Sequence, residues 1–447
     1  MPPRDGDLPD GQPLHQRGVL IMATEATRSM SNTVESSRFG MSRLLQDVFS
    51  MQEGTAGALL QRLLSAARLH LGMEVAFISE FREGRRVFRY VDEAERIDLL
   101  KVGNGDPLDE SYCQRVVDGR LPELIRDAQR VEEARKIPAT EALGIGAHLS
   151  TPIRLKDGAV FGTFCAFSFH AEHTLNERDQ ALMRVFADIA AELIEQDIQR
   201  IREEESRRKH VSSLLGWNGF HMVWQPIVEI ASGRITGVES LARFPGVDGK
   251  GPEEWFRDAA SVGLTEQLES TAVDKGLQVL EQLKPGQYVA CNTSVQALMD
   301  GDVIRRLERA PLERVVLEIT EHDVIEDYER VLGALAPLRE KGLRVAVDDA
   351  GAGYASLRHI LRLRPDIIKL DISLTRDIDT DITRRSLALA LVRFAGEIGS
   401  TLVAEGVETR EELDTLAELG VDTAQGFFLC RPQAGEALRD VLGQSLC

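Results

Sequence analysis

The chain of 447 residues has little of several things that would mark particular classes of protein. No stretch approaches the roughly 20 consecutive apolar residues that a membrane helix needs. Basic residues are in deficit, with 53 Lys and Arg against 72 Asp and Glu, and the resulting net charge of −19 argues against a general binder of nucleic-acid polymers. A site for an anionic nucleotide would therefore need local arginines, a lysine or metal cations.

Cysteine is scarce as well. The five cysteines are an odd and scattered set, and two of them are Cys113 and Cys447. The other three, Cys165, Cys291 and Cys430, fall in apolar runs and are predicted to be small core residues. This usage favours a reducing compartment, so we predict a cytoplasmic protein that is not embedded in a membrane.

The chain is long enough for two or three domains, and its apolar fraction of 43% is ordinary for globular protein. Residues 1–40, rich in Pro, Gly, Ser and Thr and without periodicity, are predicted to be a disordered leader. Over residues 41–175, strands grouped with helices to one side predict an antiparallel α+β domain.

Residues 176–212 are predicted to form a helical linker. No Gly or Pro occurs between 176 and 210, and apolar residues recur there at spacings of three and four. One interpretation is an amphipathic helix packed on its own domain. The other is a helix that leaves the domain and pairs with a second copy as a parallel coiled coil, which would make the protein a homodimer. A slip in the pattern near 197 fits a stutter in such a coil.

From residue 213 the pattern changes to eight short apolar strands that alternate with helical stretches, and the last strand is expected in AQGFFL, with Gln425 at its start. Residues 213–447 have the size of a (β/α)8 barrel. The first connector, ASGRI, is too short for a crossover helix, so the first strand is predicted to run antiparallel to its neighbours. The predicted fold is a modified TIM barrel preceded by the α+β domain.

Polar residues accompany almost every predicted barrel strand from the second onward. They are Glu239, Asn292, Glu318, Asp348, Asp349, Lys369, Asp371, Glu405 and Gln425. The carboxyl ends of parallel barrel strands converge on the face where active sites lie. Any single one of these residues has a simple interpretation as a turn former or a helix cap. Together, however, so many carboxylates could not all stay ionised without cations.

The adjacent pair Asp348 and Asp349 is predicted to bridge two divalent ions, and oxygen ligands suit Mg2+ or Mn2+. Lys369 has two interpretations: a structural ion pair with Asp371, or a group that orients the attacking water and stabilises phosphate charge. Arg243, which follows the second strand's acid on the same strand, is predicted to be a forked donor to a phosphate.

The motifs QPIV, ESLAR, NTS, LEITE, DDAGAGY, PDIIKLD, AEGVET and QGFFL, in this order and spacing, resemble the EAL-domain phosphodiesterases. The resemblance covers residues 213–447 and implies hydrolysis of cyclic di-GMP to linear pGpG with two Mg2+ or Mn2+ ions. The implied metal ligands are Glu239, Asn292, Glu318, Asp348, Asp349 and Glu405. The implied catalytic residues are Lys369, Glu405 and Asp349. The implied substrate-binding residues are Gln225, Arg243, Asp371 and Gln425. The implied supporting residues are Glu321, which braces the loop after the paired aspartates, and Glu408.

Two departures from the family pattern bear on activity. Ser240 stands where the signature has alanine, and little effect is expected because a strand neighbour faces the other way. The loop after Asp349 has Ala350 where the family usually has Phe, and Ala355 where it usually has Ser. Two alternatives therefore stay open: a barrel that binds cyclic di-GMP without turnover and signals through a protein partner, and a barrel that acts on another phosphodiester.

Residues 41–175 resemble a GAF domain, a sensor of small ligands, in the order of elements, in DESYCQRVVDGRLPELIRDA and in VFGTFCAF. The resemblance implies that an unidentified small ligand regulates the barrel. Cys113 has two interpretations. It is either a chromophore attachment site, against which the following Gln114 argues, or a helix cysteine beside a small apolar pocket. The chain has no GGDEF-like motif, so synthesis of the dinucleotide is not expected.

Overall fold

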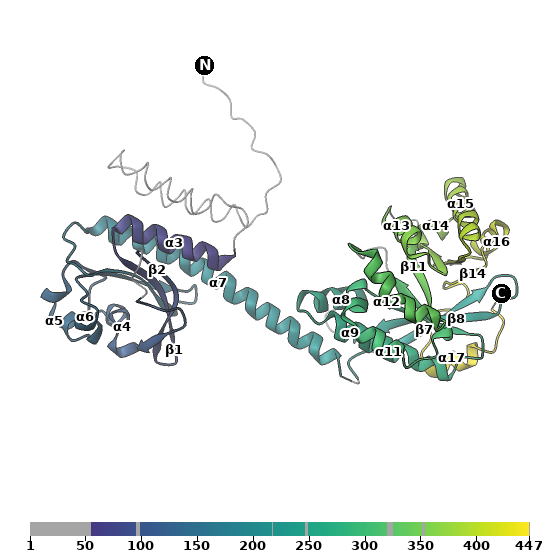
Figure 1. Ribbon diagram of the computed structural model, residues 1–447, viewed down its shortest axis with the longest axis horizontal. Helices are drawn as coiled ribbons and strands as arrows, with labels where there is room; N and C mark the ends of the chain where they lie inside the picture. The colour runs from purple at the N-terminus through teal and green to yellow at the C-terminus, as the bar shows by residue number, and fades with distance from the viewer. Residues whose placement is uncertain are drawn as a thin grey trace, which may run out of the picture. The chain divides into compact units, whose positions relative to one another are not determined.

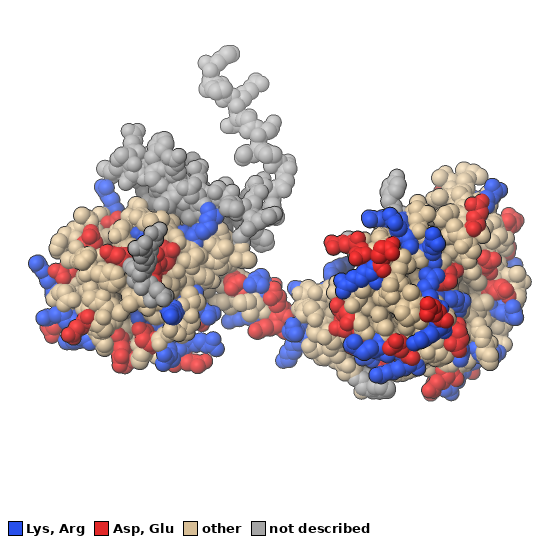
Figure 2. Space-filling view, in the orientation of Figure 1, with Lys and Arg blue, Asp and Glu red and all other residues tan. Residues whose placement is uncertain are grey.

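The computed structural model describes residues 55–94, 99–216, 218–245, 249–319, 325–350 and 354–446, except for the side chains of 354–356. The predicted leader, Glu321 and Cys447 lie outside the described residues. One compact unit ends at Ile201, and the other spans Arg202–Cys447. No helix among the described residues combines the length and apolar composition that a membrane span requires. On the face that Figure 2 shows, acidic and basic side chains are interspersed on both units.

The first unit is built on a six-stranded antiparallel sheet with the strand order β3-β2-β1-β6-β5-β4 (Figure 1). Its strands are β1 Val75–Arg82, β2 Arg85–Glu93, β3 Gly105–Pro107, β4 Leu124–Ile125, β5 Ala147–Arg154 and β6 Val160–Ser168. Its helices are α3 Ala56–Leu71, α4 Tyr112–Val117, α5 Glu132–Arg135, α6 Pro138–Ala142 and the start of α7 Glu177–Leu214. The predicted α+β architecture is confirmed.

Alternation along the strands gives this sheet two buried faces. In β1, Ala76 and Ile78 pack into a core with α3 and α7, which lie along one face of the sheet (Figure 1). Val75 and Phe77 point to the other face, where they pack with α4 and the segments around it. The sheet therefore separates a helix-covered core from a second core that contains Cys113 and Cys165.

Helix α7 has 38 residues and changes character along its length. Met183, Phe186 and Ala190 are fully buried in the core of the first unit, which supports the interpretation that the helix packs on its own domain. Residues 199–210 are mostly exposed, and Val211 and Leu214 are buried in the core of the second unit. Pairing of this helix with a second copy stays a prediction.

The second unit is a closed barrel with the strand order β10-β11-β12-β13-β14-β7-β8-β9. Its strands are β7 His221–Glu229, β8 Ile235–Arg243, β9 Tyr288–Thr293, β10 Val315–Ile319, β11 Arg344–Ala350, β12 Ile367–Leu370, β13 Thr401–Ala404 and β14 Thr423–Ala424. The first of them, β7, is antiparallel to both β8 and β14, whereas the other neighbours are parallel. The predicted modified TIM barrel is confirmed.

Helices cover the outside of the barrel (Figure 1). They are α8 Pro252–Ser261, α9 Thr265–Leu277, α10 Val295–Asp300, α11 Asp302–Leu307, α12 Tyr328–Glu340, α13 Tyr354–Leu363, α14 Ile372–Thr375, α15 Ile382–Ile398, α16 Arg410–Leu419 and α17 Gly435–Val441. Their apolar residues and the outward-facing strand residues, such as Val345 and Val347 of β11, form one core.

Two details differ from the sequence expectation. The apolar run AQGFFL was predicted to be the last strand, but β14 ends at Ala424, and Phe427 and Phe428 are 50% and 40% exposed. The chain turns at Gly426 instead of continuing the strand. At this turn Gly426 lies so close to the backbone of Val407 that a Cβ atom there would clash. Cys165 and Cys291 are buried as predicted, whereas Cys430 is only half-buried because it follows this turn.

Inside the barrel, an apolar layer supports the polar residues. The apolar layer consists of Ile227, Tyr288, Ala290, Val316, Ala346, Ile367 and Val403. Residues two apart on a strand share a face, so the next inward-facing residues of β10, β11 and β12 are Glu318, Asp348 and Lys369. Gly237 makes room for this layer, because a Cβ atom there would lie 2.6 Å from the Tyr288 ring.

Candidate functional site

Lys369 lies at the centre of the polar layer, and only 1% of its side chain is exposed. Its Nζ atom forms ion pairs with four carboxylates that come from four different segments of the barrel. The distances are 2.8 Å to Glu405 Oε1, 2.9 Å to Glu318 Oε2, 3.3 Å to Asp348 Oδ1 and 3.4 Å to Glu239 Oε1. The strand ends therefore gather the predicted acids around one buried ammonium group.

Burial and these charges oppose each other in setting the protonation of the cluster. Burial alone would lower the pKa of Lys369, but the surrounding carboxylates raise it well above its usual range. Burial raises the pKa values of Glu318 and Glu405 well above the usual range, although Lys369 partly offsets this effect. Burial also opposes ionisation of Glu239, but Lys369 and two amide donors hold its pKa below the usual value.

Asp349 joins the cluster because the backbone leaves the regular strand conformation at this point. Its φ angle is 54°, in the left-handed region that Asp tolerates better than most residues. The register between β11 and β12 also shifts between Val347 and Ala350. Two adjacent aspartates, which would face opposite sides of a regular strand, can thus serve the same site. Asp348, Asp349 and Glu405 each present a carboxylate oxygen within 4.8 Å of the others.

The chemistry of these donors fits hard divalent cations, which prefer carboxylate and amide oxygens. Five carboxylates, those of the four Lys369 partners and Asp349, face a single ammonium group. If all of them are ionised, four net negative charges remain, and two divalent cations would balance them.

Three amide side chains complete the layer. Gln425 Nε2 donates to Glu239 Oε2 (2.6 Å) and Gln225 Oε1 (3.0 Å), and Asn292 Nδ2 donates to Glu239 Oε1 (3.1 Å). Gln225 Nε2 in turn donates to the carbonyl of Cys430 (3.1 Å). The Oε1 atom of Gln425 is buried and has no hydrogen-bond partner among the described residues. It is an acceptor available to a bound group.

Some predicted residues lie outside this cluster. Asp371 follows β12 instead of lying in it, and it caps α14 by accepting a hydrogen bond from the Ser373 backbone (2.9 Å). Of the two interpretations of Lys369, the ion pair with Asp371 is not supported, since that pair is not among the ion pairs of the described residues. Likewise, Gln425 does not open β14 but follows it.

Arg243 and Glu408, both predicted to serve the site, lie at its edge and beyond it. Arg243 ends β8 half-buried, and its Nη1 donates to the carbonyl of Ala242 (2.9 Å). Glu408 lies at the surface, where it pairs with Arg376 at 3.3 Å. Ser240 points out of the barrel toward α9. Its Oγ lies close to Gly276 of that helix, at only 2.4 Å from where a Cβ atom on this glycine would be.

Two buried glutamates that the sequence did not single out hold loops of the site. Glu269 of α9 accepts hydrogen bonds from Thr293 Oγ1 (3.1 Å) and the Ser294 backbone (2.7 Å), directly after Asn292. Glu412 accepts from the backbone of Glu408 (2.8 Å), three residues after Glu405. A signal existed only for Glu412, which forms a capping box over the T-x-x-E sequence from Thr409.

Comparison with known proteins assigns both units. The sequence profile of the EAL domain matches residues 208–432, half of the chain, and the chain belongs to the EAL domain family. The profile of a GAF domain matches residues 55–195 of the first unit. The two resemblances seen in the sequence are thereby confirmed.

Curated relatives match mainly in the barrel. Cyclic di-GMP phosphodiesterase PA2567 of Pseudomonas aeruginosa is 32% identical over 235 residues, which cover 50% of this chain and 40% of that protein. Cyclic di-GMP phosphodiesterase NbdA of the same organism is 28% identical over 263 residues, which cover 56% of this chain and 33% of that protein. The matched region thus spans less than half of the length of either relative.

A solved structure matches a larger part of the chain. The structure of the EAL enzyme Bd1971 in its cAMP- and cyclic di-GMP-bound form covers 83% of this chain and 93% of that chain. Its TM-score is 0.51 and its sequence identity is 17%, so this likeness concerns the fold alone.

Proposed function

We propose that the barrel hydrolyses cyclic di-GMP to linear pGpG with the help of two divalent ions, Mg2+ or Mn2+. The observation that carries the proposal is the buried cluster in which Lys369 meets four carboxylates at the carboxyl ends of the strands of an EAL barrel. The names of the two relatives, both cyclic di-GMP phosphodiesterases, support the choice of substrate.

The ions would be held by the oxygen atoms that face the interior of the barrel. The ligand set is Glu239, Asn292, Glu318, Asp348, Asp349 and Glu405. When bound, the ions would neutralise phosphate charge and make a coordinated water more acidic. The negative charge that Lys369 leaves uncompensated supports this assignment, because a buried anionic cluster is stable only with matching cations.

The residues of the chain itself position the reacting groups. Lys369 donates a hydrogen bond that orients the attacking water, and Glu405, whose carboxylate is 2.8 Å from Lys369 Nζ, receives that water's proton. The water oxygen attacks phosphorus, and the bond from phosphorus to the 3′-oxygen breaks. That oxygen takes a proton from the solvent and Glu405 releases to the solvent the proton it received, so the product carries a 5′-phosphate and a free 3′-hydroxyl. Asp349, at the end of β11, helps to hold the ions in a fixed position relative to the strand.

The substrate is bound at the rim of this layer. Arg243 turns its guanidinium group from the carbonyl of Ala242 to a phosphate, which it recognises with two parallel N–H groups. Gln225 and Gln425 offer amide groups, and the buried Oε1 of Gln425 supports this role because it has an unused acceptor. Asp371, at the start of α14, contributes an acceptor for a guanine N–H.

The domain plan completes the proposal. The GAF domain over residues 41–175 senses a small ligand, and the helix over 176–212 transmits its state to the barrel over 213–447. The protein acts in the cytoplasm as a homodimer. As the family resemblance implies, Glu321 braces the loop after the aspartate pair, and Glu408 has a supporting role. Removal of residues 1–172 tests the regulatory part, because an uninvolved GAF domain would leave the rate of hydrolysis unchanged.

The experiment that tests the activity compares the purified chain with its Glu239→Ala variant. Incubation with cyclic di-GMP and Mn2+ or Mg2+ is expected to yield pGpG, measured by chromatography, and the variant is expected to lose this activity. Asp414→Asn, which alters an exposed carboxylate on α16, is the matched control. Tight binding without turnover would favour the receptor alternative. Equal turnover of a generic phosphodiester would contradict the choice of substrate.

A further inference from the structure

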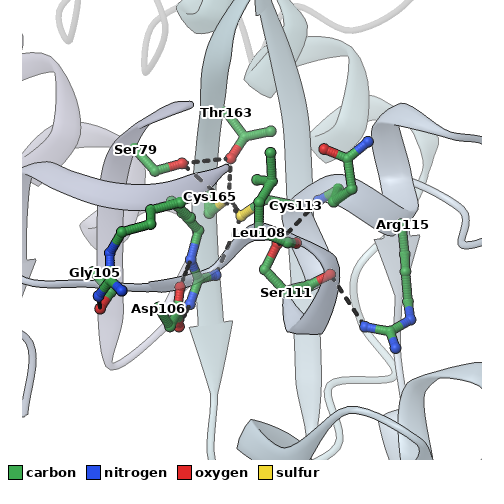
Figure 3. Close-up of polar contacts among 12 residues, drawn as sticks. Ser79, Gly105, Asp106, Leu108, Ser111, Cys113, Arg115, Thr163 and Cys165 are labelled. Atoms are coloured by element: carbon green, nitrogen blue, oxygen red, sulfur yellow. Dashed lines mark hydrogen bonds and ion pairs between the residues drawn. The ribbon is translucent and has the colours of Figure 1, made fainter. Parts of the chain in front are cut away.

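A second polar cluster lies in the GAF domain, far along the chain from the barrel residues. Cys113 of α4 and Cys165 of β6 are both fully buried, and their sulfur atoms are 3.5 Å apart. Figure 3 shows the two thiols pointing toward each other from the helix and the sheet. Two sulfur atoms in van der Waals contact need only a small movement to reach the bonded distance of about 2.05 Å.

A buried arginine approaches one of the two sulfurs. Arg86 of β2, which is 7% exposed, donates from Nη1 to Cys113 Sγ at 3.3 Å. Its Nε donates to Asp106 Oδ1 at 2.9 Å, and its Nη2 pairs with Asp106 Oδ2. The rings of Phe77 and Phe88 lie 5.4 and 4.9 Å from the guanidinium carbon. The arginine is therefore fixed with one of its nitrogen atoms aimed at the sulfur of Cys113.

Hydroxyl groups surround the other sulfur instead of charges. Cys165 Sγ donates to Thr163 Oγ1 at 3.1 Å and lies 3.1 Å from Ser150 Oγ. Ser79 Oγ bridges the two sites, at 2.9 Å from Thr163 Oγ1 and 3.9 Å from Cys113 Sγ. The two cysteines are thus chemically different, with a cation beside Cys113 and neutral groups beside Cys165.

This difference separates the acidities of the two thiols. Burial would raise the pKa of Cys113, but its contacts with Cys165, Arg86 and Thr163 outweigh burial and lower the value to about 5. Burial and the negative charge of Cys113 raise the pKa of Cys165 well above its usual range. Cys113 is therefore the thiolate and Cys165 the protonated thiol, the two forms that disulfide formation requires.

A small cavity lies beside Arg86, the residue that contacts Cys113. Its lining includes Phe77, Arg86, Ser111, Tyr112 and His148, and about 20 Å³ of it admits the centre of a water-sized molecule. That space suffices for one or two molecules of the size of water. Cys113 is not among its lining residues, so both interpretations of Cys113 stay predictions. The His148 ring stacks on Tyr112 and stays neutral, because burial and Arg86 lower its pKa to about 3.

We propose that Cys113 and Cys165 are a thiol-oxidation site that hydrogen peroxide converts into a reversible disulfide. The proposal does not rest on the proposed activity of the barrel. A peroxide molecule is close to water in size, so it fits the cavity beside Arg86. Disulfides in reducing compartments are typically transient and redox-sensing.

The reaction balances with one peroxide. The Cys113 thiolate attacks one peroxide oxygen, the O–O bond breaks, and the departing hydroxide takes up a proton as water. Cys165 then attacks the sulfur of the resulting sulfenic acid, and the S–O bond breaks as the S–S bond forms. The hydroxide that leaves takes the Cys165 proton as a second water. Two thiols and one peroxide thus become one disulfide and two waters.

The disulfide would change the cavity. To close the 3.5 Å gap, α4 has to move toward β6, and Ser111 and Tyr112, which line the cavity, move with it. Arg86 would also lose the thiolate it contacts and keep only Asp106 as an anionic partner. Oxidation therefore alters both the shape and the charge of the pocket in the sensor domain.

Peptide mapping of the oxidised full-length chain tests the proposal. The reduced chain is treated with stoichiometric hydrogen peroxide, remaining thiols are blocked, and peptides are analysed without reduction. We expect a linked pair of Cys113 and Cys165 peptides, lighter by two hydrogens than their sum, that a dithiol reductant separates. Cys291, which is 2% exposed in the barrel core and has no second cysteine among its contacts in the described part of the chain, is the internal control and should stay reduced.

Variants then assign the roles. Cys165→Ser should stop the reaction at the Cys113 sulfenic acid, which a dimedone adduct reveals. Arg86→Met should raise the pH at which Cys113 is half alkylated by about one unit or more, whereas Arg86→Lys should restore part of the shift. Failure of Arg86→Met to fold would leave the mapping of the natural chain as the deciding result. Cys113 that stays reduced, oxidises no sooner than Cys291, or links to another cysteine would overturn the proposal.

Discussion

Two of the buried cations among the described residues, Lys369 and Arg86, have very different surroundings. Lys369 in the barrel is 1% exposed and pairs with four carboxylates. Arg86 in the GAF domain is 7% exposed and meets one carboxylate, one thiol and two aromatic rings. The lysine is outnumbered by anions, so its site has room for further cations. The arginine is nearly balanced, so its effect falls on the acidity of its neighbour.

The folds account for this difference. In the barrel, parallel strands direct their carboxyl ends to the same place, and acids from distant parts of the sequence accumulate there. In the antiparallel sheet, Arg86 of β2 lies directly opposite Asp106 of β3, so one cross-strand pair satisfies most of its charge. Parallel strands that end at one place thus gather several acids around one cation, whereas the antiparallel sheet forms a single ion pair.

The largest expected effect concerns the outnumbered lysine. Lys369→Met removes a buried cation that pairs with four carboxylates, two of them buried, and we expect the free energy of unfolding in chelator to fall by about 3–5 kcal/mol. Urea unfolding followed by circular dichroism measures the change. Mn2+ should restore part of the loss, because it supplies positive charge at the same place. A variant as stable as the parent in chelator would contradict the claim that Lys369 stabilises these carboxylates.

The next effect is stabilisation by metal. Mn2+ at a hundredfold excess over its Kd should raise the free energy of unfolding of the natural chain by about 2.7 kcal/mol. Asp349→Asn should lose most of this gain, since it removes one of three converging carboxylates. Asp414→Asn, whose carboxylate is 57% exposed on α16, should keep it. Equal gains in all three proteins would mean that the cation binds elsewhere.

The support behind the barrel site can be tested at Glu269. Glu269→Ala leaves the Ser294 backbone N–H and the Thr293 hydroxyl without their acceptor, and we expect a loss of about 1–3 kcal/mol in stability. Because Asn292 precedes this loop, kcat for cyclic di-GMP should fall more than KM rises. Glu269→Gln, which keeps an acceptor oxygen, should recover much of both. An Ala variant with unchanged kinetics would limit Glu269 to a stabilising role.

The last expected effect is a pH dependence at the thiol beside the balanced arginine. The pKa of Cys113 is lowered in the folded protein, so the folded state releases its proton at a pH where the unfolded state still holds it. Its contribution to stability therefore grows as the pH rises from about 5 toward the unfolded value, by about 1 kcal/mol per pH unit. Unfolding of the reduced chain and of Cys113→Ser at pH values in this window measures it. A stability difference independent of pH would contradict a thiolate at Cys113.

The sequence predicts the barrel well because its signals are local. Short apolar runs separated by helical stretches mark the strands, and a five-residue connector requires the antiparallel start. The last strand is misjudged because AQGFFL is apolar without being buried: Phe427 and Phe428 are substantially exposed after the turn at Gly426. Apolar composition alone does not separate a buried strand from an exposed turn.

From the sequence, only those residues of the candidate site that lie at the ends of barrel strands can be predicted. The acids around Lys369 follow from the rule that parallel strands converge, whereas Asp371 is displaced because it caps α14. Glu269 carries no signal, since its helix holds other acids and only tertiary packing buries this one. Cys113 and Cys165 are 52 residues apart, and their contact depends on how α4 lies on the sheet.

The most direct test of the account counts the ions in the barrel. Titration calorimetry of the metal-free chain with Mn2+, run beside hydrolysis of cyclic di-GMP in the same buffer, measures stoichiometry and activity together. We expect two ions per chain when pGpG forms, and fewer ions with lost activity in Asp349→Asn. Hydrolysis by a chain that binds no ion, or two bound ions without any hydrolysis, would contradict it.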